Sequence, residues 1–202
     1  MTPRDCLSCG ATLLLRRRHA LTCSPACRQR LARARRTHTP PRAMQAAPRW
    51  VRWELRDVDG RAAKMPLQVD GRRAAVNRSY TWGGFGPVSA SRTGDGYGFV
   101  LGDGFGCYDL DGALERGRLL PWAADVLASI PEPVIFTEVS QSGRGVHAFV
   151  EAPEERGTVT RLDAGRRVER YTWGRYIAMT GAPLRLDPVS YTHLTLPTNR
   201  EV

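Results

Sequence analysis

The chain has 202 residues, of which 42% are hydrophobic and 25% are charged. This is the composition of a folded globular protein rather than a disordered one. No apolar run approaches the roughly 20 residues that a membrane helix needs. The apolar stretch near the N-terminus runs directly into three arginines, unlike the core of a signal peptide. We therefore expect a protein of the cytosol with no membrane partner.

The net charge of +10 is unevenly distributed. Residues 1–49 hold 11 arginines and one acid, Asp5, whereas basic and acidic side chains balance over residues 50–202. A basic segment joined to a neutral domain indicates a polyanion as the partner of the first part.

Four of the five cysteines lie within the first 27 residues, in the stretches CLSC and CSPAC. Their spacing is typical of a small zinc site, in which two close pairs each supply half of a tetrahedron. Two disulfides are the alternative, which a reducing cytosol disfavours. We predict a structural zinc ion bound by Cys6, Cys9, Cys23 and Cys27.

Ser24 followed by Pro25 is typical of a helix N-terminus, with a capping hydroxyl and a proline in the first turn. The helix would continue through ACRQRLARARR. Its arginines predict contacts with DNA phosphates, with a merely solvated basic face as the alternative. These arginines are Arg28, Arg30, Arg33, Arg35 and Arg36. We call residues 1–36 the cysteine module.

Residues 37–48 are rich in proline and alanine and lack periodicity, so we interpret them as a linker. The second domain is expected over residues 49–188. Residues 189–202 lose the arginine and alanine bias and resemble a peptide translated from sequencing-adapter DNA. We interpret this tail as an artefact and expect the natural protein to continue beyond residue 188.

The second domain is expected to contain short strands and few helices. Alternating apolar residues predict a strand at 50–55, and two apolar runs around Gly-Asp-Gly predict a β-hairpin over 97–111. Helical spacing predicts a helix at 119–130. Further strands are expected at 133–139, 146–152, 166–173 and 175–181. Short connections favour an α+β fold with a mainly antiparallel sheet.

Asp109 and Asp111 are the first candidates for chemistry. Residues i and i+2 of a strand face the same side, so both carboxylates would project together while Leu110 turns into the core. Adjacent carboxylates repel each other unless a cation lies between them, and Mg²⁺ or Mn²⁺ prefers such oxygen ligands. Alone, the pair is equally compatible with a polar turn.

The stretch SQSGRGVH, residues 140–147, adds phosphate-binding candidates. Its glycines allow a turn with exposed backbone N–H groups, as in an anion-binding nest. Ser142 and Arg144 could bind phosphate oxygens, and His147 could donate to them at the start of the next strand.

Glu169 is the third acid that we expect to face the same cleft. Glu138 and Asp163 are competitors, and Glu169 is preferred because it lies in the middle of its predicted strand.

In this order, CYDLDG, SQSGRGVH and VERY with GRYIAMTG resemble the motifs of bifunctional primase-polymerases (Prim-Pol), a branch of the archaeo-eukaryotic primase superfamily common in phages and plasmids. The resemblance covers about residues 50–183, and GRAAKMP and YTW look like the same branch. The cysteine module looks like small zinc fingers fused to such replication proteins.

The resemblance implies an RNA-recognition-like sheet plus an α/β subdomain, and template-dependent nucleotidyl transfer with two metal ions. It implies that Asp109, Asp111 and Glu169 bind two Mg²⁺ or Mn²⁺ ions. The implied partners are single-stranded DNA template, nucleoside triphosphates and a helicase domain or subunit.

The same resemblance implies that His147, Ser142 and Arg144 bind the incoming triphosphate. Lys64, which is the only lysine, and Arg175 are further phosphate-binding candidates.

Two other functions compete with this one. The chain could be a zinc-finger DNA-binding protein whose second domain binds nucleotide without catalysis. The aspartate pair also suits metal-dependent glycosyl transfer, but that chemistry needs neither the glycine-rich loop nor the cysteine module.

Overall fold

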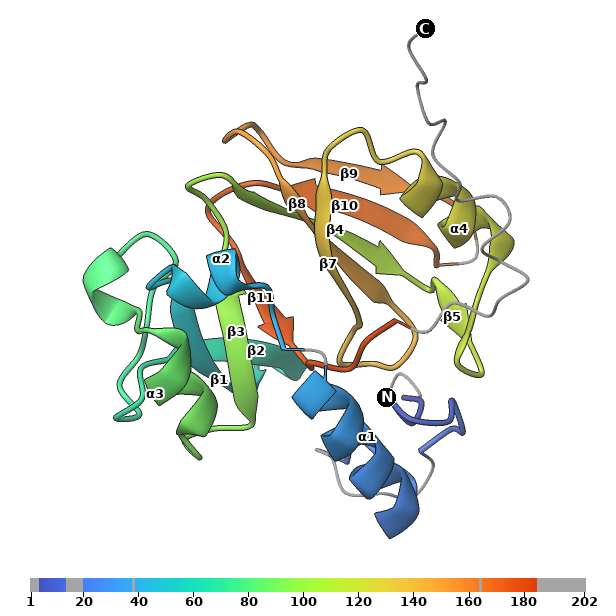
Figure 1. Ribbon diagram of the computed structural model, residues 1–202, viewed down its shortest axis with the longest axis horizontal. Helices are drawn as coiled ribbons and strands as arrows, with labels where there is room; N and C mark the ends of the chain where they lie inside the picture. Colours follow the sequence, from blue (N-terminus) through green and yellow to red (C-terminus); the bar gives the residue numbers. More distant parts are fainter. Residues whose placement is uncertain (1–3, 14–19, 38, 164, 185–202) are drawn as a thin grey trace, which may run out of the picture.

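Two antiparallel β-sheets form the body of the protein in a computed structural model that describes residues 4–13, 20–37, 39–163 and 165–184 (Figure 1). The first sheet has the strand order β11-β3-β1-β2, and the second has the order β7-β8-β4-β10-β9. A two-stranded hairpin, β5-β6, pairs with neither sheet, although its Leu114 packs with Leu110 and Val146 of the second sheet. The antiparallel sheets and the few short helices confirm the predicted α+β class.

The strands are β1 (Trp50–Val58), β2 (Arg61–Leu67), β3 (Gly96–Val100), β4 (Phe105–Asp111), β5 (Leu114–Glu115), β6 (Arg118–Leu119), β7 (Val134–Val139), β8 (Val146–Glu151), β9 (Thr158–Arg161), β10 (Arg167–Tyr171) and β11 (Tyr176–Met179). The helices are α1 (Pro25–Thr37), α2 (Arg42–Ala46), α3 (Phe85–Ala90) and α4 (Pro121–Ala128), with a 3₁₀ turn at Ser79–Thr81.

The main core lies between the two sheets. Trp50 and Phe99 come from the first sheet, Cys107 and Phe149 come from the second, and all four are fully buried in one cluster. The ring of Phe99 packs edge-on against those of Trp50 and Phe149, with centroids 4.9 and 6.4 Å away. Aromatic burial of this kind contributes much of the stability of a small domain. It fixes the two sheets relative to each other.

The β-hairpin predicted over residues 97–111 is wrong. β3 and β4 form at the expected residues, but β3 pairs with β1 and β11, whereas β4 pairs with β8 and β10. Gly102, Asp103 and Gly104 all have positive φ and turn the chain from one sheet to the other. Both apolar runs are buried in the core between the sheets, and each strand is hydrogen-bonded on both edges within its own sheet, so β3 and β4 do not pair with each other.

The other predicted elements of the second domain are confirmed, with ends shifted by a few residues, as β1, α4, β7, β8, β10 and β11. Helix α4 begins at Pro121, as the sequence indicated, and Ala123 packs with Leu110 and Val146 on one face of the second sheet. Within the segment interpreted as a linker, α2 buries Met44 completely, and the Met44 carbonyl accepts a hydrogen bond from the Trp50 indole at 2.9 Å.

In the part of the chain that the structure describes, no helix is long and apolar enough to cross a bilayer. The tail at 189–202 lies outside the described residues.

Candidate functional site

Four polar side chains form a row across the second sheet. In the strand register, Glu138 of β7 is opposite His147 of β8, His147 is opposite Asp109 of β4, and Asp109 is opposite Glu169 of β10. Directly opposed residues of antiparallel strands project to the same face, with Cβ atoms about 5 Å apart. We call these four residues the polar row.

An apolar row lies two residues away on the same four strands. It consists of Phe136, Phe149, Cys107 and Tyr171, which are opposite one another in the same order. The first three belong to the core between the sheets, and Tyr171 packs against it. Because side chains of a strand alternate with a period of two, the polar row faces the first sheet just beyond that core.

The structure confirms that β4 continues through Asp111 and that Leu110 is fully buried against the α4 side of the sheet. Asp109 and Asp111 therefore project from the same face, as predicted. Burial raises the pKa of Asp109 and the Asp111 carboxylate adds to this shift, while the attraction of His147 opposes it.

A cavity of about 170 Å³ lies over the polar row, which we call the polar cavity. Its lining brings together five of the predicted site residues: Lys64, Asp109, His147, Glu169 and Arg175. Lys64 comes from β2 of the first sheet, so the cavity lies between the sheets. Burial lowers the pKa of Lys64, although attraction to the acids of the second sheet opposes the shift.

Arg175 lies just before β11 at the edge of the polar cavity. Its guanidinium is 4.3 Å from the centre of the Tyr171 ring and donates a hydrogen bond to the Tyr171 hydroxyl at 3.0 Å. Two cationic side chains therefore face the acidic part of the polar row. Such an arrangement can bind a phosphate chain together with a cation held by the acids.

His147 is held from two sides. Its Nδ1 lies 2.9 Å from Oε1 of Glu138, and its Nε2 lies 3.8 Å from Oδ1 of Asp109. Burial lowers the pKa of His147, but attraction to Asp109 and the hydrogen bond with Glu138 outweigh burial, so the net shift is upward. A protonated imidazole in this position can donate to a phosphate oxygen.

Arg167 is a site residue that the sequence reasoning missed. Its guanidinium donates to Oδ2 of Asp111 from Nε at 3.0 Å and also from Nη2, and its Nε lies 2.9 Å from Oε1 of Glu169. The alternation of RVERY could have revealed it, because residues 167, 169 and 171 share one face of a strand.

The three acids fit a divalent ion in their chemistry and in their placement on one face. Carboxylate oxygens are the ligands that Mg²⁺ and Mn²⁺ prefer. Arg167 bridges Asp111 and Glu169 in this structure and offsets one of their two negative charges, so it competes with a bound cation for both acids. Among the described residues, the acids do not gather their oxygens as tightly as the cysteines gather their sulfurs.

The four cysteines of the module lie with all their Sγ atoms within 4.8 Å of one another. Cys23 Sγ is 3.5 Å from Cys9 Sγ and 3.6 Å from Cys27 Sγ. Thiolates on one tetrahedral zinc ion would be about 3.8 Å apart, given Zn–S bonds of about 2.3 Å. A disulfide needs about 2.05 Å, and all five cysteines are free. The cluster can hold a metal ion such as zinc, and the disulfide alternative is wrong.

The helix that follows begins as predicted. The Cys27 N–H donates to the Ser24 hydroxyl at 3.2 Å, which caps α1. Ser24, and after it the Arg30 guanidinium, lower the pKa of Cys27 to about 6. This favours the thiolate, which is the form that binds metal.

The cysteine module packs against the glycine-rich loop of residues 140–145. Arg144 donates to both carboxylate oxygens of Asp5, at 3.1 and 3.3 Å, and the Asp5 N–H donates to the Ser142 carbonyl at 2.8 Å. At Gly143, with φ of 77°, an added Cβ would lie 2.3 Å from the Asp5 carbonyl oxygen. Ser142 and Arg144 thus contact the module and are not part of the polar cavity lining.

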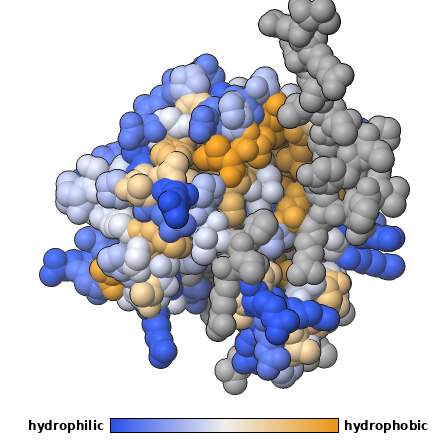
Figure 2. All heavy atoms as spheres, viewed as in Figure 1, coloured by the Kyte–Doolittle hydropathy of each residue, from blue (hydrophilic) through white to orange (hydrophobic). Residues whose placement is uncertain are grey.

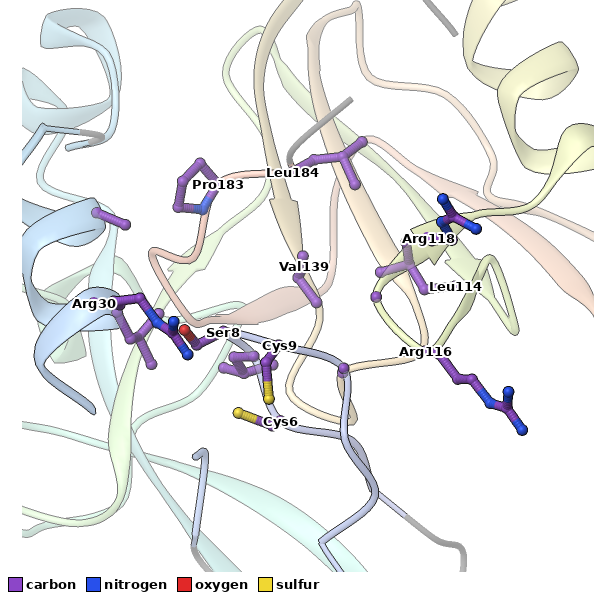
Figure 3. A pocket seen from close by; sticks show the side chains of 16 residues that line it. Cys6, Ser8, Cys9, Arg30, Leu114, Arg116, Arg118, Val139, Pro183 and Leu184 are labelled. Carbon is purple, nitrogen blue, oxygen red and sulfur yellow. The ribbon is translucent and has the colours of Figure 1, made fainter. Parts of the chain in front are cut away.

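A larger cavity, of about 280 Å³, lies along this seam between the module and the β5-β6 hairpin (Figure 3). Among the described residues, its lining includes three arginines and no acid: Arg30, Arg116 and Arg118. Figure 3 shows Arg30 beside Ser8 near the cysteine turn, whereas Arg116 and Arg118 extend away from that turn. The basic lining suits an anionic partner.

Helix α1 presents a hydrophilic surface to solvent (Figure 2). Arg28, Arg30 and Arg33 are exposed on it, and Arg30 donates to Cys27 Sγ at 2.9 Å. Arg35 and Arg36 are within α1, but their side chains lie outside the described residues.

The chain is similar to a known replication protein. In an alignment of 149 positions that covers 69% of the chain, it is 32% identical to the DNA Primase-polymerase of Nitratiruptor phage NrS-1. The chain spans about one fifth of the length of that relative, since the match covers 20% of it. No family model matches the chain. The similarity confirms the resemblance predicted from the motifs: over this region the protein is primase-polymerase-like.

Proposed function

We propose that the second domain catalyses template-dependent nucleotidyl transfer, making or extending primers in phage, plasmid or bacterial DNA replication. The polar row carries this proposal, because it places Asp109, His147 and Glu169 on one face of a rigid antiparallel sheet, with Lys64 and Arg175 across the cavity. The similarity to a phage DNA primase-polymerase supports the same reaction class.

In this proposal, Asp109, Asp111 and Glu169 hold two divalent ions, Mg²⁺ or Mn²⁺. When bound, such ions activate the attacking 3′-hydroxyl and stabilise the charge of the leaving pyrophosphate. Arg167 keeps the carboxylates from repelling one another before the ions bind, and it then becomes available to the nucleotide.

The side chains around the acids bind and orient the triphosphate. Lys64, from the first sheet, and Arg175, from the segment just before β11, are the cationic phosphate ligands, and His147 donates from Nε2. Direct nucleotide contacts by Ser142 and Arg144 stay predictions, because both residues are engaged by the cysteine module in this structure.

The cysteine module, with zinc bound by its four thiolates, is proposed to bind the single-stranded template. The exposed arginines of α1 and the basic seam beside the β5-β6 hairpin offer contacts to the phosphate backbone. A helicase domain or subunit, expected from the resemblance, would supply the unwound strand.

The test is incorporation of labelled nucleotides on a primed single-stranded template with Mn²⁺. Asp109→Asn and Glu169→Gln should each lower the rate by at least about 100-fold, because each removes an ion ligand. Asp125→Asn is the matched control, since Asp125 is exposed on α4 and distant from the polar row along the chain. Nucleotide binding without incorporation by the wild-type protein would favour the alternative, a DNA-binding protein with a non-catalytic nucleotide site.

A further inference from the structure

Glu138 is a buried carboxylate that the proposed reaction does not use. It stands at the end of the polar row, on β7, and none of its surface is exposed. An ionisable group in such a place is strongly destabilising unless other groups compensate for the lost water. Its partners therefore indicate what it does.

Backbone groups after β11 bind one side of this carboxylate. The Gly181 N–H donates to Oε2 at 2.7 Å, and the Thr180 N–H donates to Oε2 at 3.1 Å and lies 3.2 Å from Oε1. The carboxylate is thus tied to the segment that follows the first sheet. Both oxygens of Glu138 are engaged, and Glu138 is not among the residues that line the polar cavity, whereas Glu169 is.

The Thr180 hydroxyl also donates to Oε2 of Glu138, at 3.4 Å, and on the other side Glu138 contacts His147. Oε1 lies 2.9 Å from Nδ1, and His147 is itself 4% exposed. A carboxylate whose neighbours are all donors acts as an acceptor, so the hydrogen of this bond belongs to Nδ1. The other ring nitrogen, Nε2, then lies on the side of Asp109 and the cavity.

We propose that Glu138 is a positioning residue for His147: it accepts the Nδ1–H bond, fixes the orientation of the ring, and leaves Nε2 directed into the polar cavity for a phosphate oxygen of the nucleoside triphosphate. The phosphate ligand rests on the proposed function, whereas the anchoring of the ring does not. At metal sites, replacing a carboxylate that orients a ligating histidine costs roughly 10- to 100-fold in affinity, and we expect an effect of similar size for a histidine that binds phosphate.

The anchoring is tested by the imidazole nitrogen signals of protein labelled with ¹⁵N-histidine. The chain has four histidines, so His147→Gln identifies the signals of His147 by their loss. The wild-type protein should show Nδ1 protonated. In Glu138→Gln, the side-chain amide presents N–H to Nδ1 while its oxygen keeps the backbone bonds, so Nδ1 should lose its hydrogen while Nε2 keeps the one that it donates to phosphate. An unprotonated Nδ1 in the wild-type protein, or an unchanged spectrum in Glu138→Gln, overturns the proposal.

The consequence for the site is tested by the binding of dATP in Mg²⁺, measured by calorimetry. Glu138→Gln should raise Kd by about 10-fold or more. Glu151→Gln, an exposed position on the same strand β8 as His147, should leave Kd unchanged. Equal affinity of Glu138→Gln and the wild-type protein overturns the positioning role. Failure of the wild-type protein to bind dATP overturns the proposed function instead, and the nitrogen signals still decide the anchoring.

Discussion

The ion pair between Asp5 and Arg144 joins the cysteine module to the loop that leads into His147. Replacing Asp5 by Asn removes its charge without changing its shape, and replacing Arg144 by Gln removes the other charge. If the pair holds the two parts together, the effects of the single and double substitutions on the free energy of unfolding will not be additive.

The structure sets the expected magnitude. Two charged hydrogen bonds of 3.1 and 3.3 Å would contribute several kcal/mol if both groups were buried, and Asp5 is only 4% exposed. The Arg144 side chain is 37% exposed, so solvent screens part of the attraction. We therefore expect a coupling energy of about 1–2 kcal/mol, between the values for exposed and buried pairs.

The assay is urea unfolding of the full chain in a double-mutant cycle, with the metal-loaded protein. The control is the same cycle on Asp70 and Arg72, whose side chains are 48% and 82% exposed and 3.4 Å apart. Their coupling should be below about 0.5 kcal/mol. Equal coupling energies for the two pairs would refute the reasoning, because burial of Asp5 would then add nothing.

Three further predictions concern the module and the acids. In urea unfolding, Gly143→Ala should destabilise the protein by about 1 kcal/mol or more beyond Gly60→Ala, because both glycines have similar positive φ, 77° and 75°, but only at Gly143 would a Cβ meet another segment. Equal losses of stability would mean that the backbone at Asp5 shifts at no cost to make room for the Cβ. The double variant Cys6→Ser, Cys9→Ser should lose about one zinc ion per chain, measured by elemental analysis, and bind DNA more weakly, whereas Cys107→Ala, in the core, should keep the metal. Zinc retained in the double variant would exclude this site. Arg167→Ala should lower the Kd for Mn²⁺, measured by electron paramagnetic resonance, by roughly 5-fold, because a cation that competes for Asp111 and Glu169 is removed. Weaker Mn²⁺ binding would show that Arg167 instead holds the two acids in place for the ion.

The local pattern of the sequence was sufficient to predict much of the candidate site. The i, i+2 spacing of Asp109 and Asp111 determines their common face once β4 continues through Asp111, and Leu110 between them is buried as expected. The capping residues Ser24 and Pro25 likewise determine where α1 begins. These features depend only on neighbours in the chain.

The features that were missed depend on contacts between distant segments. The prediction of a hairpin over 97–111 is wrong because β3 and β4 pair with strands of two different sheets, and no local sequence pattern specifies those partners. The pairing of Arg144 with Asp5 joins residues 139 positions apart, so the glycine-rich loop could not be recognised as a docking surface for the module. The role of Glu138 depends on the backbone at Thr180 and Gly181.

The location of the divalent ions can be measured directly by substituting Fe²⁺ for Mg²⁺ in the zinc-loaded protein and mapping the oxidative cleavage of the chain by mass spectrometry. We expect cleavage within β4 and β10, around Asp109 and Glu169, and both excess Mg²⁺ and Asp109→Asn should suppress it. Cleavage confined to other parts of the chain, or cleavage at these strands that Asp109→Asn leaves unchanged, would contradict the claim that Asp109, Asp111 and Glu169 hold the divalent ions.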